Sequence, residues 1–486
     1  MKLQERLFIG GEWVEPSSSA KIDVVNPHSE EVIARVPEGR ETDIDRAVAA
    51  ARAAFDEGPW PRMTPAERAD AMERLLANLQ ARSDELAVTI TEEMGSTISF
   101  SHMGQVMAAN MVLHYYIGLA RTYPFEEIRP GMLGPCLVRR EAVGVAGAIV
   151  PWNVPLFVIM LKLGPALAAG ATVVLKPAPE TPLDAWILAE AIEAAGLPKG
   201  VVNIVPAGRE VGEHLVRHKD VDKIGFTGST AAGRRIASIC GGDLKRVTLE
   251  LGGKSAAIIL DDADLATTVA GLLPGALINN GEACAATTRI LASRRRYREV
   301  CDALAVAVGD WSVGDPMDPA TLCGPLVASR QRDRVEGYIR AGKEEGAKVA
   351  CGGGRPAALK KGWYVEPTLF VDVDNRMRIA QEEIFGPVLA VIPYDDERDA
   401  VRIANESDYG LSGAVWTADV DHGLEVAKRI RTGTYTVNGF SMEFSAPFGG
   451  YKSSGIGREL GPEGLAAYLE LKQVNLPMGY EAKSGS

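Results

Sequence analysis

Glu250 and Cys284 stand at the two ends of one stretch of the chain, and both lie close to glycines. Glu250 opens the run Glu-Leu-Gly-Gly-Lys, and Cys284 closes the run Asn-Gly-Glu-Ala-Cys. Glycines at segment ends allow the backbone to approach a cleft closely. A thiol and a carboxylate placed in this way are a candidate nucleophile and a candidate general base. Taken alone, a cysteine is more often a small buried hydrophobe, and a glutamate is more often a solvated side chain.

The elements that would position these two groups alternate between strands and helices. Ahead of Glu250, helical patterns at 156–169, 183–195 and 209–217 separate short β-branched apolar runs at 143–150, 172–175, 201–205 and 223–227. Fully apolar strands between helices predict a parallel sheet covered on both faces. Ligands bind such sheets at the carboxyl ends of the strands, and Asn153, Lys176 and Ser229 fall there.

The rest of the chain adds a second α/β unit and an N-terminal region. The second unit is predicted from 255 onward, with strands at 258–260, 289–292, 389–392, 412–416 and 434–437 and helices at 330–345 and 397–405. Residues 7–14 predict a hairpin with a glycine turn, and short strands are expected near 24–25 and 32–36. The pattern is helical from 41 to about 120, with Thr64 and Pro65 as a capped helix start.

Five further motifs, taken with the Glu250 and Cys284 segments, resemble the aldehyde dehydrogenase superfamily. The seven occur in the family's order and with nearly its spacings, over residues from about 8 to 475. The five are Pro151-Trp152-Asn153, Lys176-Pro177-Ala178-Pro179-Glu180-Thr181, Phe226-Thr227-Gly228-Ser229-Thr230, Glu382-Glu383-Ile384-Phe385-Gly386-Pro387 and Pro447-Phe448-Gly449-Gly450-Tyr451-Lys452. The resemblance implies an NAD(P)-dependent enzyme of the hydrolytic branch, which oxidises an aldehyde to the carboxylic acid.

The resemblance also implies a fold. We expect an α/β protein with two doubly wound α/β domains, one Rossmann-like for the cofactor and one catalytic, and a small β oligomerisation arm. The expected boundaries are 1–121 and 143–250 for the cofactor domain, 251–440 for the catalytic domain, 122–142 and 467–486 for the arm, and 441–466 for a return segment to the cofactor domain. The arm predicts a homodimer or homotetramer.

Three residues would perform the reaction by this resemblance. Cys284 attacks the aldehyde, and the Asn153 side-chain amide and the Cys284 backbone N–H form the oxyanion hole. Glu250 then activates the water that hydrolyses the thioester. Without the resemblance, Asn153 reads as a turn or capping residue.

Six residues are expected to bind the cofactor. Without the resemblance, residues 226–233 would be read as an ordinary βα turn, Lys176 as a solvated lysine at the end of a strand, and Glu383 and Phe385 as part of a turn before Gly386-Pro387. The expected contacts are Ser229 with the phosphates, Lys176 with the adenine ribose, Glu383 with the nicotinamide ribose, Phe385 beside the ring, and Trp152 and Gly228 nearby. NAD is the expected cofactor.

Pro179 departs from the family pattern. Many NAD-preferring relatives have a glutamate there, which grips the ribose hydroxyls and repels a 2′-phosphate. Here Glu180 stands beside that position instead, so NADP use is expected as well.

The expected substrate tunnel is apolar, lined by Val154, Val158, Leu161, Met442 and Phe448. This favours uncharged aliphatic or aromatic aldehydes. The alternatives are a CoA-acylating enzyme, which generally lacks a glutamate at 250, a dehydrogenase specific for semialdehydes, and a non-catalytic structural relative, which would be expected to lose the thiol or the carboxylate.

Composition limits the remaining partners. A net charge of −12 over 486 residues argues against nucleic acid and anionic membranes. The six cysteines lack metal-ligand or disulfide spacing, which predicts no metal site and reduced thiols in the cytoplasm. The apolar stretch 143–161 approaches a membrane span in length, but Pro151 and Pro155 interrupt it. We therefore expect no membrane partner.

Overall fold

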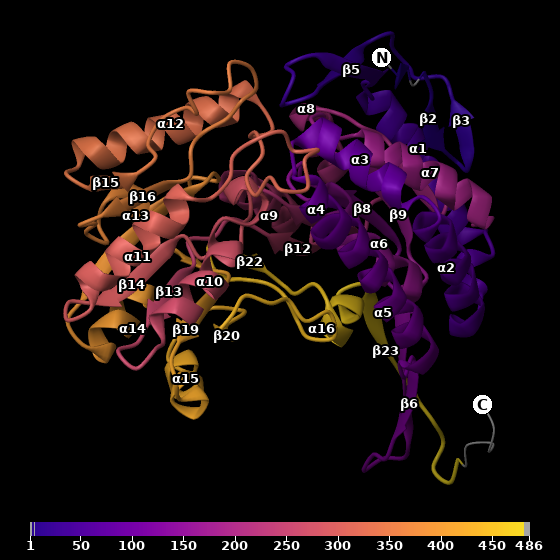
Figure 1. The fold of residues 1–486 in the computed structure, drawn as a ribbon. Coiled ribbons are helices and arrows are strands. Elements are labelled where there is room, and N and C mark those ends of the chain that lie inside the picture. The colour runs from indigo at the N-terminus through magenta and orange to yellow at the C-terminus, as the bar shows by residue number, and fades with distance from the viewer. Residues whose placement is uncertain (1, 4, 481–486) are drawn as a thin grey trace.

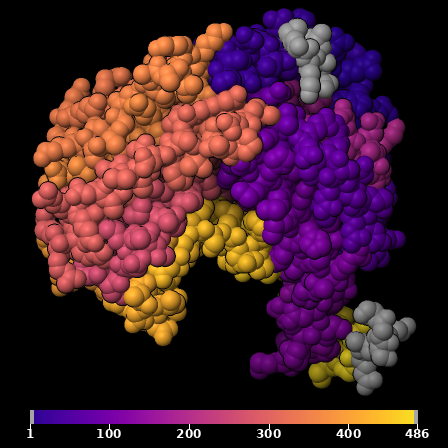
Figure 2. Space-filling model, in the orientation of Figure 1, coloured from indigo at the N-terminus to yellow at the C-terminus, as the bar shows by residue number. Residues whose placement is uncertain are grey.

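Two β-sheets from different parts of the chain organise the computed structural model, which describes residues 2–3 and 5–480 (Figure 1). The last six residues of the predicted arm, with the Gly/Ser tail, lie outside the described residues, as do positions 1 and 4. In Figure 1 the lobe around the first sheet is indigo to magenta, and the lobe around the second is coral to orange. Figure 2 shows a hollow between them, crossed by the yellow C-terminal segment.

The first sheet has the strand order β22-β12-β11-β8-β9-β10-β2-β3, in which β12 to β10 are parallel and the outer strands antiparallel. The four predicted apolar runs before Glu250 are confirmed as β8 to β11. The strand that ends in Glu250 was not predicted. The bounds are β2 Leu7–Ile9, β3 Glu12–Val14, β8 Val145–Ile149, β9 Thr172–Lys176, β10 Val202–Ile204, β11 Lys223–Thr227, β12 Arg246–Glu250 and β22 Gly455–Ile456.

Helices cover both faces of this sheet because alternate residues of its strands point to opposite sides. In β8, Val145 and Ile149 pack with the helices of one face, and Ala146 and Ala148 pack with those of the other. The first face holds α1 Glu41–Asp56, α8 Arg209–Arg217 and α9 Thr230–Gly242. The second holds α2 Pro65–Gln80, α3 Ser83–Met94, α5 Ala108–Thr122, α6 Pro155–Ala169 and α7 Leu183–Ala195.

The predicted helical region 41–120 is confirmed, with one unforeseen feature. Thr64 caps α2 as expected, since its Oγ1 accepts from the Glu67 N–H at 3.2 Å and its N–H donates to the Glu67 carboxylate at 2.7 Å. Between α3 and α5 the chain forms a π-helical segment, which sequence periodicity did not indicate. The short elements here are η1 Trp60–Arg62, α4 Ile98–Phe100 and the π-helix η2 Ser101–Met107.

The second sheet has the order β15-β16-β17-β14-β13-β19-β20 and is parallel except for the edge pair β15–β16. The five predicted strands are confirmed, and β15 and β16 are additional. The strands are β13 Ala256–Ile259, β14 Arg289–Ser293, β15 Lys348–Cys351, β16 Thr368–Val371, β17 Val388–Tyr394, β19 Gly413–Trp416 and β20 Thr436–Val437. The helices are α10 Leu265–Ala276, η3 Ile278–Gly281, α11 Tyr297–Gly309, α12 Ser329–Glu344, α13 Arg378–Gln381, α14 Glu397–Asn405 and α15 Val420–Ala427.

A three-stranded sheet projects from the first lobe (Figure 1). Its middle strand β7 pairs with β6 on one side and with the C-terminal β23 on the other, so the two predicted arm segments pair with each other. The strands are β6 Glu126–Arg129, β7 Cys136–Ala142 and β23 Leu469–Asn475. The remaining elements are β1 Lys2–Leu3, β4 Lys21–Val25, β5 Val32–Pro37, β18 Tyr409–Gly410, β21 Tyr451–Lys452 and α16 Gly461–Ala466.

The apolar stretch 143–161 is divided between β8 and α6 by a turn at Pro151. Within the described part of the chain, no helix combines the length and the apolar character needed to cross a membrane.

Candidate active site

The parallel strands of the first sheet end at one edge and bring the predicted residues together there. Lys176 is the last residue of β9 and Glu250 the last of β12, while Asn153 and Ser229 follow β8 and β11. The register pairs Ile149 with both Lys176 and Phe226, and Thr227 with Glu250. The side chains are therefore neighbours because the strands end level with one another.

Cys284 is positioned by a strained turn. Asn279 and Asn280, in η3, both have positive φ, at 51° and 61°, a conformation that asparagine tolerates better than most residues. The Asn280 amide holds the turn by donating to the carbonyls of Gly95 and Pro325 at 2.9 and 3.0 Å. The half-buried Cys284 follows directly.

The glycines after Glu250 are needed for close packing against this turn. A Cβ at Gly253 would lie 2.1 Å from the carbonyl oxygen of Cys284, so only a glycine fits there. The glycine after Glu250 therefore allows the Glu250 segment to pack closely against the Cys284 segment.

Asn153 is locked beside the Cys284 segment. Its Nδ2 donates to the carbonyl of Glu282 at 2.8 Å, two residues before the thiol. Its own backbone carbonyl accepts from Asn279 Nδ2 at 2.8 Å and from Gln105 Nε2 at 3.2 Å. One N–H of the Asn153 amide is engaged, which leaves the other available for an oxyanion.

Glu250 is almost fully buried, and neither of its carboxylate oxygens has a hydrogen-bond partner among the described residues. Burial raises the pKa of Glu250 well above its usual range, and the charge of Glu459 raises it further, against the effect of Lys162 and Arg458. A carboxylate whose pKa is raised is a stronger base than an ordinary one, as general-base catalysis requires. The ordinary interpretation of Glu250 as a solvated side chain is wrong.

The thiol needs a base to ionise. Burial raises the pKa of Cys284 to about 12, and the charges of Glu383 and Glu250 add to this, while the N–H groups of Cys284 and Ala285 oppose it. These influences also place both carboxylates close to the thiol.

A buried ion pair behind Glu250 was missed in the sequence. Lys162 Nζ donates to Glu459 at 2.7 Å and to Thr227 Oγ1 at 2.6 Å. Glu459 lies far away in sequence, so nothing local linked the two. The available signal was one lysine inside the otherwise apolar helix α6.

Ser229 and Gly228 form the start of α9. Ser229 is the N-cap, its Oγ accepts from the Ala232 N–H at 3.3 Å, and the first turn contains no acidic residue. The Gly228 N–H donates to the Glu250 backbone carbonyl at 3.0 Å, which ties this turn to the end of β12. The exposed helix start suits a phosphate group.

Lys176 is buried, so its interpretation as a solvated lysine at the end of a strand is wrong. Its ammonium donates to the carbonyls of Pro177 and Ala207 at 3.1 and 2.8 Å. Burial lowers the pKa of Lys176 to about 8, and the charge of Glu180 opposes this shift.

Glu383, Phe385 and Trp152 lie where the two lobes meet. Glu383 Oε1 accepts from the Gly253 N–H at 3.0 Å, and burial raises the pKa of this carboxyl. Phe385 has a φ of 65°, and its ring meets Trp152 edge to face at 5.3 Å between centroids. Glu383 and Phe385 line a small cavity together with Gly253.

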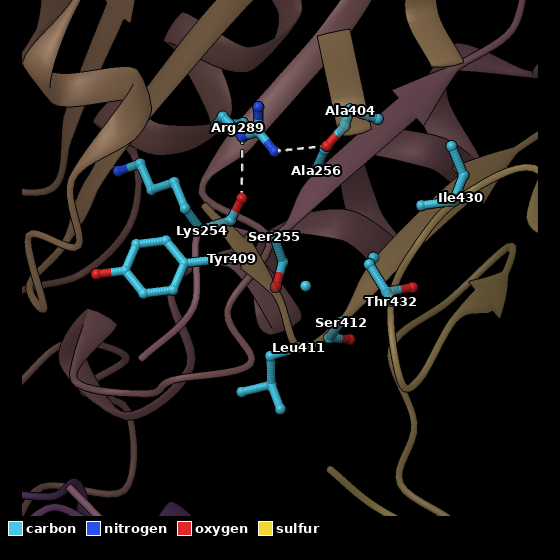
Figure 3. Close-up of a pocket in the computed structure, with 12 residues that line it drawn as sticks. Lys254, Ser255, Ala256, Arg289, Ala404, Tyr409, Leu411, Ser412, Ile430 and Thr432 are labelled. Carbon is cyan, nitrogen blue, oxygen red and sulfur yellow. Dashed lines mark hydrogen bonds between the residues drawn. The ribbon is translucent and has the colours of Figure 1, made fainter. Parts of the chain in front are cut away.

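Arg289 anchors the segment that follows Glu250 (Figure 3). Its buried guanidinium donates to the carbonyls of Lys254 at 2.9 Å and Ala404 at 3.0 Å, while the Lys254 side chain extends away from it. This fixes the turn between β12 and β13 to the second lobe.

The predicted tunnel residues lie in one apolar cluster that also contacts Cys284. Val158, Leu161 and Phe448 are buried in it, and Val154 and Met442 pack against it half-buried. Phe157, Phe440 and Phe444 belong to the same cluster and were not predicted.

Comparison with known proteins gives consistent matches. The profile described as the aldehyde dehydrogenase family matches residues 13–474. Geranial dehydrogenase of Castellaniella defragrans is 48% identical over 473 residues, covering 97% of this chain and 98% of that protein.

Two solved structures are similar over nearly the whole chain. The Mycobacterium tuberculosis aldehyde dehydrogenase complexed with NAD+ matches with a TM-score of 0.98 and 49% identity, over 99% of this chain and 100% of that one. A mutant of aldehyde dehydrogenase C from Pseudomonas syringae, complexed with NAD+ and octanal, matches with a TM-score of 0.94 and 44% identity, over 97% and 96%.

Proposed function

The chain belongs to the aldehyde dehydrogenase family and is an NAD(P)-dependent enzyme that oxidises aldehydes; we propose that it converts uncharged aldehydes to carboxylic acids by covalent catalysis at Cys284. One observation supports this above all. Glu250 is a buried carboxyl whose two oxygens have no hydrogen-bond partner in the described part of the chain, and its charge raises the pKa of the Cys284 thiol. A non-catalytic relative would have no use for such a costly group.

The residues of the candidate site fit the cofactor. The helix start at Ser229 suits a pyrophosphate, and the half-buried Glu383 and the buried Lys176 offer an acceptor and a donor to hydroxyl groups. NAD+, when bound, supplies the hydride acceptor.

Cys284 loses its proton, with Glu250 as the base in reach, and its sulfur bonds to the aldehyde carbon. The resulting oxyanion receives the free N–H of the Asn153 amide and the backbone N–H of Cys284. Donors of this kind lower a barrier by about 3–4 kcal/mol each. Departure of the hydride from the substrate carbon leaves a thioester on Cys284.

Hydrolysis of that thioester is assigned to Glu250. Glu250 first releases the thiol proton to solvent. Its carboxylate then takes a proton from water, the hydroxide bonds to the acyl carbon, and the carbon–sulfur bond breaks to release the acid and the Cys284 thiolate. An acyl transfer to coenzyme A would not need a carboxylate here, so the buried Glu250 favours hydrolysis.

The apolar cluster around Cys284 favours an aliphatic or aromatic substrate over a charged semialdehyde. Val158, Leu161 and Phe448 present no group that could pair with a second carboxylate. Two of the similar proteins fit this choice, since one is named geranial dehydrogenase and another is complexed with octanal.

A panel assay tests the function. Octanal, benzaldehyde, geranial and succinic semialdehyde are each supplied with NAD+ or NADP+, with and without coenzyme A, while reduced nicotinamide and free acid are measured. We expect acid in equal amount to reduced cofactor, the highest kcat/KM for uncharged aldehydes, and no acceleration by coenzyme A. An acyl-CoA product, or a preference for the semialdehyde, would contradict the proposal.

We further propose a homodimer or homotetramer in the cytoplasm. Within the described residues, β6 and β23 are the edges of the projecting sheet, and Leu133 and Leu471 are exposed there, as suits pairing with another subunit. All six cysteines are free, which agrees with a reducing compartment. Light scattering that gives a monomeric mass would overturn the assembly.

A further inference from the structure

Glu180, in the turn after β9, forms an ion pair with Arg330 in the first turn of α12. The Glu180 side chain is 19% exposed and that of Arg330 is 62% exposed. Glu180 belongs to the first lobe and Arg330 to the second, so the pair bridges the two lobes. Arg330 retains enough solvent exposure to reorient toward another anion.

Lys176 adds a second cation to this pair. Glu180 lies close enough that its charge opposes the lowering of the Lys176 pKa by burial. One carboxylate thus pairs with a guanidinium and also acts electrostatically on an ammonium. With all three groups ionised, the cluster Lys176–Glu180–Arg330 has a net charge of about +1.

The cluster lies at the same sheet edge as the phosphate site at Ser229. The strands β9 and β11 are separated only by β8. Two strand spacings amount to about 10 Å, the span of a ribose attached to a pyrophosphate. In nucleotide-binding parallel sheets, an acidic residue near this edge accepts a hydrogen bond from the ribose 2′-hydroxyl, or an arginine binds the 2′-phosphate.

We propose that Arg330, held by Glu180, is a specificity-determining residue for the 2′ position of the adenosine ribose, and that the pair allows both NAD and NADP to bind. A lone Glu180 would repel a phosphate dianion. Arg330 neutralises that charge and offers a planar guanidinium for the phosphate. This rests on the proposed function only in placing the adenosine ribose at Lys176.

Variants that replace each charged side chain with a neutral amide distinguish a role in cofactor recognition from a role in holding the two lobes together. Calorimetric dissociation constants for NAD+ and NADP+ are measured on Glu180→Gln, Arg330→Gln and the double variant, without aldehyde. Glu180→Gln leaves a cluster charge of about +2 and should bind NADP+ about tenfold tighter, the effect of one unit charge on a dianion roughly 6 Å away in water. Arg330→Gln should weaken NADP+ binding by about the same factor, and NAD+ binding should change little in both.

The double variant restores the net charge of about +1 and should return the NADP+ to NAD+ ratio close to the wild-type value. Glu336→Gln, which removes a carboxylate from the same helix where it pairs with Arg355, is the matched control and should leave the ratio unchanged. If the pair only clamps the lobes together, both single variants will weaken both cofactors alike, and the proposal fails. Because binding needs no turnover, an inactive wild type would contradict the proposed function and leave this test intact.

Discussion

The two ends of the proposed site differ in whether their ionisable side chains have hydrogen-bond or ion-pair partners. At the cofactor edge, Lys176 has two carbonyl partners and Glu180 is paired with Arg330. At the proposed reaction centre, both oxygens of Glu250 lack hydrogen-bond partners among the residues that the structure describes, and burial raises the pKa of Cys284 to about 12. Charges that have partners remain ionised and can recognise a ligand, whereas a buried carboxyl or thiol without a partner is suited to gaining or losing a proton. Loss of a group at the reaction centre should therefore affect kcat, and loss of one at the cofactor edge should affect binding.

The largest effect is expected from Cys284→Ala. Without the nucleophile, formation of both reduced cofactor and acid should fall by at least about 10⁴-fold. Steady-state rates with octanal measure this. Cys351→Ala removes another half-buried thiol and should remain active. Substantial turnover by Cys284→Ala would place the nucleophile elsewhere.

Glu250→Gln should separate the two halves of the reaction. The amide keeps the shape but cannot accept a proton, so deacylation should slow by roughly 10²–10⁴-fold. Rapid mixing should then show up to one equivalent of reduced cofactor per site, and mass spectrometry should find the acyl group on Cys284. If Glu250 is also the only route to the thiolate, the burst will be slow and will recover at higher pH.

Turnover of Glu250→Gln near the wild-type rate would end this assignment, as would an acyl label on another cysteine. Glu366→Gln, a variant of a carboxylate outside the proposed site, is a suitable control for the loss of an acidic group.

Lys176→Ala tests the cofactor edge. Loss of a charged donor should raise the KM for NAD+ about tenfold and leave kcat nearly unchanged. The pKa of Lys176 is about 8, so the ammonium is present below that pH and is lost above it. The wild-type KM should therefore rise above pH 8, and that of the variant should not. The exposed Lys199 supplies a control as Lys199→Ala; a fall in kcat with constant KM would contradict the comparison.

The smallest effect is expected from Glu459→Gln, which tests how a neighbouring charge sets the pKa of Glu250. The charge of Glu459 raises the pKa of Glu250, so its removal should let Glu250 ionise at lower pH. The acidic limb of the kcat profile should then move to lower pH, while that of the exposed Glu463→Gln stays in place. A shift to higher pH would show that the unpaired Lys162 has reorganised the network.

Much of the fold follows from local patterns. Apolar runs and helical periodicity predicted β8 to β11 and the five strands from β13 to β20 because burial on both faces of a sheet leaves a continuous apolar signal. The strand β12, which ends in Glu250, was missed because Arg246 at its start is exposed and breaks that signal. The edge strand β15 alternates exposed and half-buried residues and gave no clear pattern either.

The order and spacing of the motifs, through the family resemblance, predicted from the sequence that Asn153, Glu250 and Cys284 belong to one site. The chemical state of the site residues could be known only from the folded structure. Burial of Lys176, the missing partners of Glu250 and the pairing of Arg330 with Glu180 all depend on segments far apart in the chain. A residue's type fixes which charges it can have, but the pKa depends on neighbours and water access, which exist only after the chain has folded.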